Sequence, residues 1–147
     1  MIYIGIDPGK SGAIASMTCA RGCSPVVSFI KCSDTEHELS DFLMGASTPS
    51  TFAFIEQVSA MPRQGVSSTF KFGQSYGFLR GLLVAHRIPF ETVTPAKWQG
   101  FMRCRSGGDK NVTKAAAQRL FPDVKVTHAN ADALLLAEYA RRIRSEV

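Results

Sequence analysis

Five short apolar runs along the chain have the length and composition of β-strands. They cover residues 2–7, 13–18, 26–31, 51–58 and 90–94. A glycine-containing turn follows the first run, and Ser24-Pro25 precedes the third, so the first three read as consecutive strands. The first run ends on Asp7-Pro8-Gly9. That ending fits either a simple hairpin turn or a strand that holds one carboxylate at a chosen point.

Helical spacing of apolar residues appears between and after these runs. The stretch Ser33-Asp34-Thr35-Glu36 fits a capping box ahead of one helix. Residues 70–86 form a second helical pattern, and Thr94-Pro95 supplies an N-cap and a first-turn proline for a third. Residues 110–120 and 131–144 follow a Gly-Gly break. The order βββαβαβ followed by helices predicts an α/β fold, a mixed five-stranded sheet flanked by helices, in one domain over residues 1–147.

Three glycines share one face of the helix predicted at 70–86. Gly73, Gly77 and Gly81 are spaced four residues apart, and each costs roughly 1 kcal/mol relative to alanine inside a helix. Close approach of another backbone would offset that cost. We expect this backbone to belong either to the sheet of the same domain or to a second subunit.

Composition narrows the class of protein. Apolar residues make up 45% of the 147 positions, and no apolar run approaches the roughly 18–20 residues of a membrane span. With no signal-peptide pattern, we expect a cytoplasmic protein whose four cysteines are reduced thiols. Their spacing lacks the Cys-x-x-Cys pairs of a zinc site. The net charge of +5 points towards a polyanionic partner.

Three carboxylates fall at the ends of predicted elements among apolar neighbours. Asp7 closes the first strand, and Glu56 shares a strand face with Phe52 and Phe54. Asp132 begins the last helix, on the face with Leu135, Leu136 and Tyr139. A carboxylate in such surroundings costs several kcal/mol unless it is paired or bound to a cation. Each could instead be a turn residue, a helix-dipole partner or one half of an ion pair, but all three together favour a Mg²⁺ site.

Four stretches in order, IGIDPG, AFIEQV, FGQSYG and ADALLLA, resemble the RuvC-type Holliday-junction resolvases, most closely those of bacteriophages. The resemblance runs from Ile4 to Ala137. It implies a ribonuclease-H-like fold and a homodimer that cuts two opposed strands of a four-way DNA junction and leaves 5′-phosphate nicks. It also implies two Mg²⁺ or Mn²⁺ ions per active site, held by Asp7, Glu56 and Asp132, with Lys110 on the DNA backbone or the scissile phosphate.

The sequence departs from the family in two places. The usual fourth ligand position holds Ala129, and His128 could replace it as a metal ligand or general base if the last helix already includes residue 128. Asn130 is a weaker alternative. Ser59 stands where some resolvases place an aromatic wedge, so Met61 or Phe70 could open the junction instead.

Basic residues near these motifs are candidates for DNA contact. The set is Lys10, Arg63, Lys71, Arg103, Arg105, Lys110 and Lys114. Two other functions would share part of this pattern: a ribonuclease-H-like nuclease acting on RNA or an RNA–DNA hybrid, and a junction-binding protein without catalysis. An actin-like ATPase also begins with a strand bearing Asp-x-Gly, but it needs two such domains around its nucleotide.

Overall fold

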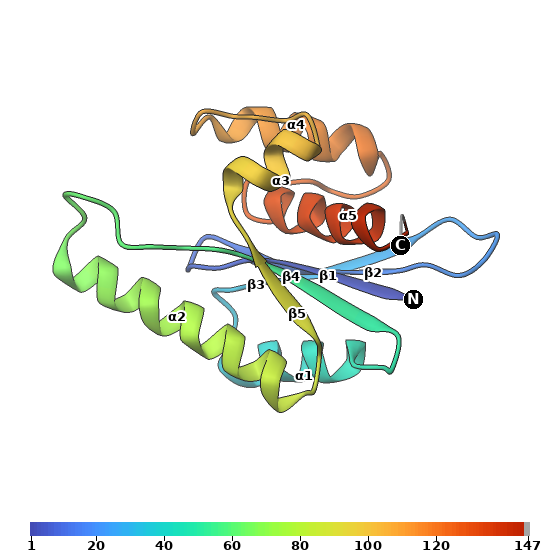
Figure 1. Cartoon of the computed structure of the whole chain (residues 1–147), viewed down its shortest axis with the longest axis horizontal. Coiled ribbons are helices and arrows are strands. Elements are labelled where there is room, and N and C mark those ends of the chain that lie inside the picture. Colours follow the sequence, from blue (N-terminus) through green and yellow to red (C-terminus); the bar gives the residue numbers. More distant parts are fainter. Residues whose placement is uncertain (146–147) are drawn as a thin grey trace.

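A mixed five-stranded sheet forms the centre of the computed structural model, which describes residues 1–145 (Figure 1). Its strands are β1 (Ile2–Asp7), β2 (Ala13–Thr18), β3 (Val26–Lys31), β4 (Thr51–Glu56) and β5 (Phe90–Val93). They lie in the order β3-β2-β1-β4-β5. Strand β2 runs antiparallel to both β1 and β3, whereas β4 runs parallel to β1 and β5 parallel to β4. The predicted mixed sheet is confirmed, and β4 and β5 end slightly earlier than expected.

Helices cover both faces of this sheet (Figure 1). Helices α1 (Glu36–Ala46) and α2 (Val66–Ala85) lie on one face. Helices α3 (Pro95–Phe101), α4 (Lys110–Leu120) and α5 (Ala131–Ser145) lie on the other, with α5 directly on the strands. The alternation of side chains along the strands divides the core accordingly. Ile4, Ile6 and Ile55 join the cluster under α1 and α2, and Tyr3 and Phe54 join the one under α5.

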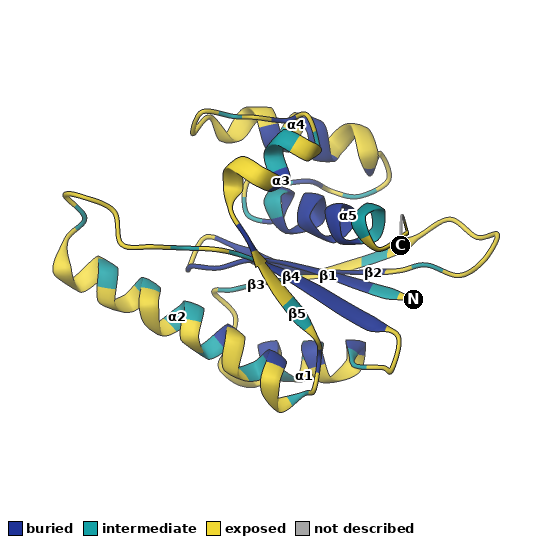
Figure 2. Ribbon diagram, in the orientation of Figure 1, coloured by how far each residue is buried: buried dark blue, intermediate teal, exposed yellow. Residues whose placement is uncertain are grey.

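Helix α5 approaches β1 very closely because β1 carries glycine at the contact. A Cβ atom at Gly5 would collide with the backbone of Ala133 and Ala137 and would lie 2.7 Å from the Cβ of Leu136. Helix α5 is accordingly buried along most of its length (Figure 2). This contact fixes the start of α5 relative to the end of β1.

Two helix starts differ from the prediction. The capping box of α1 is formed by Thr35 and Glu38, not by Ser33 and Glu36: the Glu38 N–H donates to Thr35 Oγ1 at 3.2 Å and the Thr35 N–H donates to Glu38 Oε2 at 2.9 Å. Helix α2 begins at Val66, four residues before the expected start, with Gly65 as its N-cap. The predicted Thr94 N-cap and Pro95 start of α3 are confirmed.

The glycine face of α2 does not contact the sheet. Among the described residues, no atom outside α2 lies within 4 Å of a Cβ placed at Gly73, Gly77 or Gly81. The opposite face of α2 is the one that packs inward, through Leu79 and Leu83. The expectation that the sheet of this domain approaches the glycines is therefore wrong, and the second-subunit alternative stays a prediction.

No helix in the described part of the chain is long and apolar enough to cross a membrane. All four cysteines, which lie within that part, are free thiols.

Candidate active site

Asp7 and Glu56 lie side by side at the ends of neighbouring parallel strands. Ile6 pairs with Ile55 in the β1–β4 register, and the next residue of each strand is the acid. Parallel neighbours are about 4.8 Å apart, so both carboxylates leave the same edge of the sheet. Both also point to the face that α5 covers, because Phe54, two residues before Glu56, packs there. The sheet topology thus brings together two acids that are far apart in sequence.

The β1–β2 turn closes tightly against Asp7. The Gly12 N–H donates to the Gly9 carbonyl at 3.0 Å, and Gly9 adopts a φ of +105°, which favours glycine. A Cβ at Gly12 would collide with the Asp7 carbonyl oxygen and would lie 3.2 Å from the carboxyl carbon. The Asp-Pro-Gly stretch is therefore both a hairpin turn and the holder of a buried carboxylate.

Asp132 comes from the first turn of α5 and completes the group. Residues Ala131 and Ala133 to Ala140 of this helix are buried, and Asp132 is only partly so. Asp132 lines the same hollow as Glu56, Lys110 and Thr113. Within the described residues, its Oδ1 atom is buried and has no hydrogen-bond partner. An orphaned buried carboxylate oxygen is costly in a folded protein and calls for a missing partner.

The carboxylates interact electrostatically. Burial, followed by the charges of Glu56 and Asp132, raises the pKa of Asp7 well above its ordinary value. Burial is also the main cause that raises the pKa of Glu56, with Asp132 adding to it. The charge of Lys110 opposes both pKa shifts. Lys110, at the first position of α4, therefore lies close enough for its charge to act on both acids.

This donor set fits a hard divalent cation. It consists of carboxylate oxygens, one of them orphaned, and Mg²⁺ prefers oxygen ligands. Within residues 1–145, no three acidic, histidine or cysteine side chains already stand in an arrangement that could hold an ion. Three carboxylates without a cation repel one another, and one oxygen of Glu56 is engaged elsewhere.

The partner of Glu56 is Trp98, which the sequence analysis did not single out. Trp98 lies on α3 and is fully buried. Its Nε1–H donates to Glu56 Oε2 at 2.7 Å. The only sequence signal was that Trp98 is the single tryptophan of the chain, one turn after a well-marked helix start.

The two candidates for a fourth ligand have different environments. Helix α5 begins at Ala131, so His128 is outside it and the helical-spacing argument does not hold. His128 instead is exposed beside the β1–β2 turn, where it lines a hollow with Lys10 and Gly12. Asn130 is fully buried, accepts from the Thr127 N–H at 2.8 Å and donates to the Lys125 carbonyl at 3.1 Å. The amide of Asn130 therefore holds the turn before α5.

The hollow beside His128 is strongly cationic. It has a volume of about 370 Å³ and contains no acidic residue among its described lining. Its charged residues are Lys10, Lys31 and Lys110. Lys31 was not among the predicted DNA contacts, although it ends a predicted strand much as Asp7 does. Such a hollow is suited to an anionic group.

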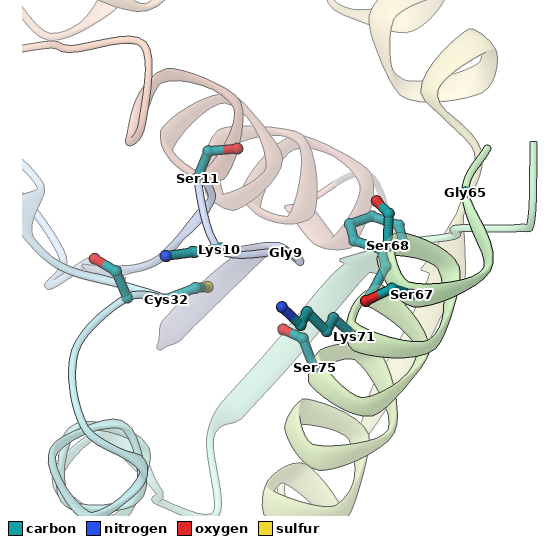
Figure 3. Close-up of a pocket in the computed structure, with 11 residues that line it drawn as sticks. Gly9, Lys10, Ser11, Cys32, Gly65, Ser67, Ser68, Lys71 and Ser75 are labelled. Carbon is teal, nitrogen blue, oxygen red and sulfur yellow. The ribbon is translucent and has the colours of Figure 1, made fainter.

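A larger groove separates the β1–β2 turn from α2 (Figure 3). It has a volume of about 1160 Å³ and is lined by Lys10, Lys71, Phe72 and several serines. Figure 3 shows Lys71 and Ser75 on α2, facing Lys10 and Cys32 across the groove. The Cys32 thiol donates weakly to the Asp7 carbonyl, and burial raises its pKa to about 12. The thiol is therefore not reactive at neutral pH.

The remaining predicted DNA contacts divide into two groups. Arg105 lines the hollow of about 520 Å³ that contains Glu56, Lys110 and Asp132. Arg63 lies in the loop between β4 and α2, Arg103 follows α3, and Lys114 is on α4. These three line none of the three hollows described above.

Comparison with solved structures identifies the fold. A structure of Thermus thermophilus RuvC superposes with a TM-score of 0.61 at 14% identity, covering 98% of this chain and 97% of that one. T. thermophilus RuvC in complex with a Holliday junction substrate superposes with a TM-score of 0.62 at 14% identity, covering 99% and 96%. This chain has a RuvC-like fold. The resemblance noted in the sequence and the expected ribonuclease-H-like architecture are thereby confirmed at the level of the fold. No protein-family model and no curated protein matches the sequence.

Proposed function

We propose that this protein is a metal-dependent endonuclease that resolves four-way DNA junctions by paired nicks leaving 5′-phosphates. The observation that carries the proposal is that Asp7, Glu56 and Asp132, from three separate elements, come near enough for their charges to interact, with an orphaned carboxylate oxygen on Asp132. A purely DNA-binding protein has no need of three mutually repelling acids, one buried and two partly buried. The RuvC-like fold, one neighbour of which is bound to a Holliday junction, supports the choice of substrate.

The chain would hold Mg²⁺ or Mn²⁺, two ions per site, through the carboxylates of Asp7, Glu56 and Asp132. Bound ions of this type stabilise the negative charge that develops on phosphate oxygens during hydrolysis. Lys110 would neutralise the scissile phosphate, since its charge already acts on both strand-end acids. His128 would serve as a further ligand or accept a proton from the attacking water.

Branched DNA would be bound mainly through its phosphates. The cationic hollow of Lys10, Lys31 and Lys110 would take the backbone next to the scissile phosphate, and the serine-lined groove with Lys71 would take the continuing strand. Phosphate contacts position a duplex without reading its sequence, so recognition would depend on junction shape. Arg63, Arg103, Arg105 and Lys114 would contact more distant phosphates.

A cleavage assay tests this function directly. With Mg²⁺ or Mn²⁺, we expect cleavage of a four-way junction but not of a linear duplex of matching sequence or an RNA–DNA hybrid. Asp7→Asn and Asp132→Asn should bind the junction with the affinity of the wild-type protein and cut it at least about a hundredfold more slowly, since even losing a group that only orients a ligand typically costs 10- to 100-fold. Preferential cleavage of the hybrid would identify a ribonuclease instead, and wild-type cleavage by Asp7→Asn would refute the site.

A homodimer would supply the second active site that paired nicks require. The outer face of α2 is a suitable interface, because Val66 is 88% exposed, Phe70 66% and Val84 67%, in line with the bare glycines (Figure 2). Such a face allows two helices to pack closely. Met61 lies just before α2 and Phe70 lies near its N-terminus. Either side chain would therefore reach the centre of a junction from the N-terminal end of α2.

Gly77→Leu tests the interface. Since the space around Gly77 is open in the single chain, the substitution should leave the fold intact and prevent dimerisation. Gly45→Leu on α1, where the space is equally open, is the matched control. Sedimentation of Gly77→Leu as a dimer of wild-type stability would contradict the α2 interface.

A further inference from the structure

The indole N–H of Trp98 is a buried donor with a charged acceptor. Trp98 is 0% exposed and packs in the core under α5 with Val93 and Cys104. A buried indole N–H needs a hydrogen-bond partner. Here the partner is Glu56 Oε2, at 2.7 Å and 42 residues away along the chain. That short distance is typical of a hydrogen bond to an ionised group.

Helix α3 holds this donor rigidly. Thr94 caps the helix by accepting from the Lys97 N–H at 3.3 Å, and Pro95 occupies its first turn. These features set the start of α3 directly after β5, which is paired with β4. The tryptophan is therefore fixed to the strand next to the one that carries Glu56, and its ring cannot turn without disrupting the core.

Among the described residues, Trp98 gives the Glu56 carboxylate its one hydrogen bond. It is the last residue of β4, and its long side chain ends in a partly exposed hollow. The indole engages Oε2, and among the described residues Oε1 forms no hydrogen bond. One oxygen is thereby held while the other stays available to a ligand in the hollow that Glu56 shares with Asp132.

We propose that Trp98 is a positioning residue that orients Glu56 for the divalent ion. The inference rests on the proposed function and extends it to a residue outside the ligand set. Groups that orient a metal ligand typically change metal affinity 10- to 100-fold when they are removed. If Trp98 were only a packing residue, losing its N–H would lower stability and leave ion affinity unchanged.

The single tryptophan allows a one-atom test. Replacing it during expression with benzothienylalanine keeps the ring size and exchanges the N–H for sulfur, at position 98 alone. Mn²⁺ affinity measured by calorimetry should fall about tenfold or more, while binding of a four-way junction in the absence of metal is unchanged. Trp98→Phe should show the same loss of affinity with a larger loss of stability.

Tyr139→Phe is the control, because Tyr139 is a buried aromatic of the same core that loses one polar atom without contacting the acids. It should bind Mn²⁺ as the wild-type protein does. Indole fluorescence gives a second readout: adding Mg²⁺ to the wild-type protein should change the emission, with the same half-saturation as Mg²⁺ binding followed by calorimetry.

Wild-type Mn²⁺ affinity in the benzothienylalanine protein would overturn the role of Trp98 and leave the nuclease proposal standing. Failure of the wild-type protein itself to bind Mn²⁺ would overturn both.

Discussion

We expect the ionised carboxylate of Asp7 to lower the stability of the metal-free protein. Asp7 is only 9% exposed, and its carboxylate faces the charges of Glu56 and Asp132. Burial and repulsion both favour the protonated form, which is why the pKa of Asp7 is raised. A residue that costs stability in this way is typical of a functional site, where binding of a ligand recovers the cost.

Asp7→Asn should therefore stabilise the metal-free protein at neutral pH. We expect Tm to rise, by roughly 2–4 °C for each kcal/mol of stability recovered in a domain of about this size. Mg²⁺ should raise the Tm of the wild-type protein and have little effect on the variant. Asp41→Asn, at an exposed position on α1, should change neither value. Differential scanning fluorimetry checks this, and a lower Tm for Asp7→Asn without metal would contradict it.

The rise in Tm that Asp7→Asn causes in the metal-free protein should depend on pH. The pKa of Asp7 in the folded protein is raised above its ordinary value of 3.8. Folding therefore favours the protonated carboxyl, and this stabilisation is fully present below pH 3.8 and is lost as pH rises through the folded pKa. The difference in Tm between variant and wild type should thus be small near pH 4 and grow towards neutrality. A pH series without metal measures it. A difference that shrinks with rising pH would show that Asp7 is not buried among like charges.

At the scale of elements, the packing of α5 on β1 sets the distance between Asp132 and the two strand-end acids. Gly5→Ala would push a methyl group into the backbone of α5 at Ala133 and Ala137. We expect a loss of about 1–3 kcal/mol, as for an overpacked core, together with weaker Mn²⁺ binding. Gly45→Ala, in open space on α1, should be neutral or stabilise by up to about 1 kcal/mol. Chemical denaturation measures the stability of both variants, and calorimetry measures their Mn²⁺ binding. If Gly5→Ala were destabilised but bound Mn²⁺ as the wild-type protein does, the packing of α5 on β1 would not control the geometry of the site.

The elements were largely predictable because turn residues separate them. Strands β1, β2 and β3 and helix α4 have the expected bounds, each beside a glycine or proline turn. The cap of α1 was misassigned because Ser33 and Thr35 both precede a glutamate by three residues, and only the path of the chain after β3 selects Thr35. Trp98 and Lys31 were missed because their places at the site depend on which strands are neighbours, which local patterns do not encode.

At the scale of the whole molecule, Lys10, Lys31 and Lys110 gather in one hollow at the sheet edge where β1 ends on Asp7. Lys10 is in the β1–β2 turn and Lys31 ends β3, at the same edge of the sheet as Asp7. Arg21, by contrast, is in the β2–β3 connection at the opposite end of these strands. A phosphate backbone bound by Lys10 and Lys31 would therefore pass beside Asp7.

Salt dependence of junction binding tests this arrangement. Lys10→Ala and Lys31→Ala should each weaken binding and reduce the slope of log affinity against log salt by about one, since each removes one phosphate contact. Arg21→Ala removes the same charge from the molecule at the far end, so it should leave the slope unchanged within error. Fluorescence anisotropy with a labelled four-way junction and metal-free protein gives these slopes. Equal changes in all three variants would mean that net charge, and not the hollow beside Asp7, attracts the DNA.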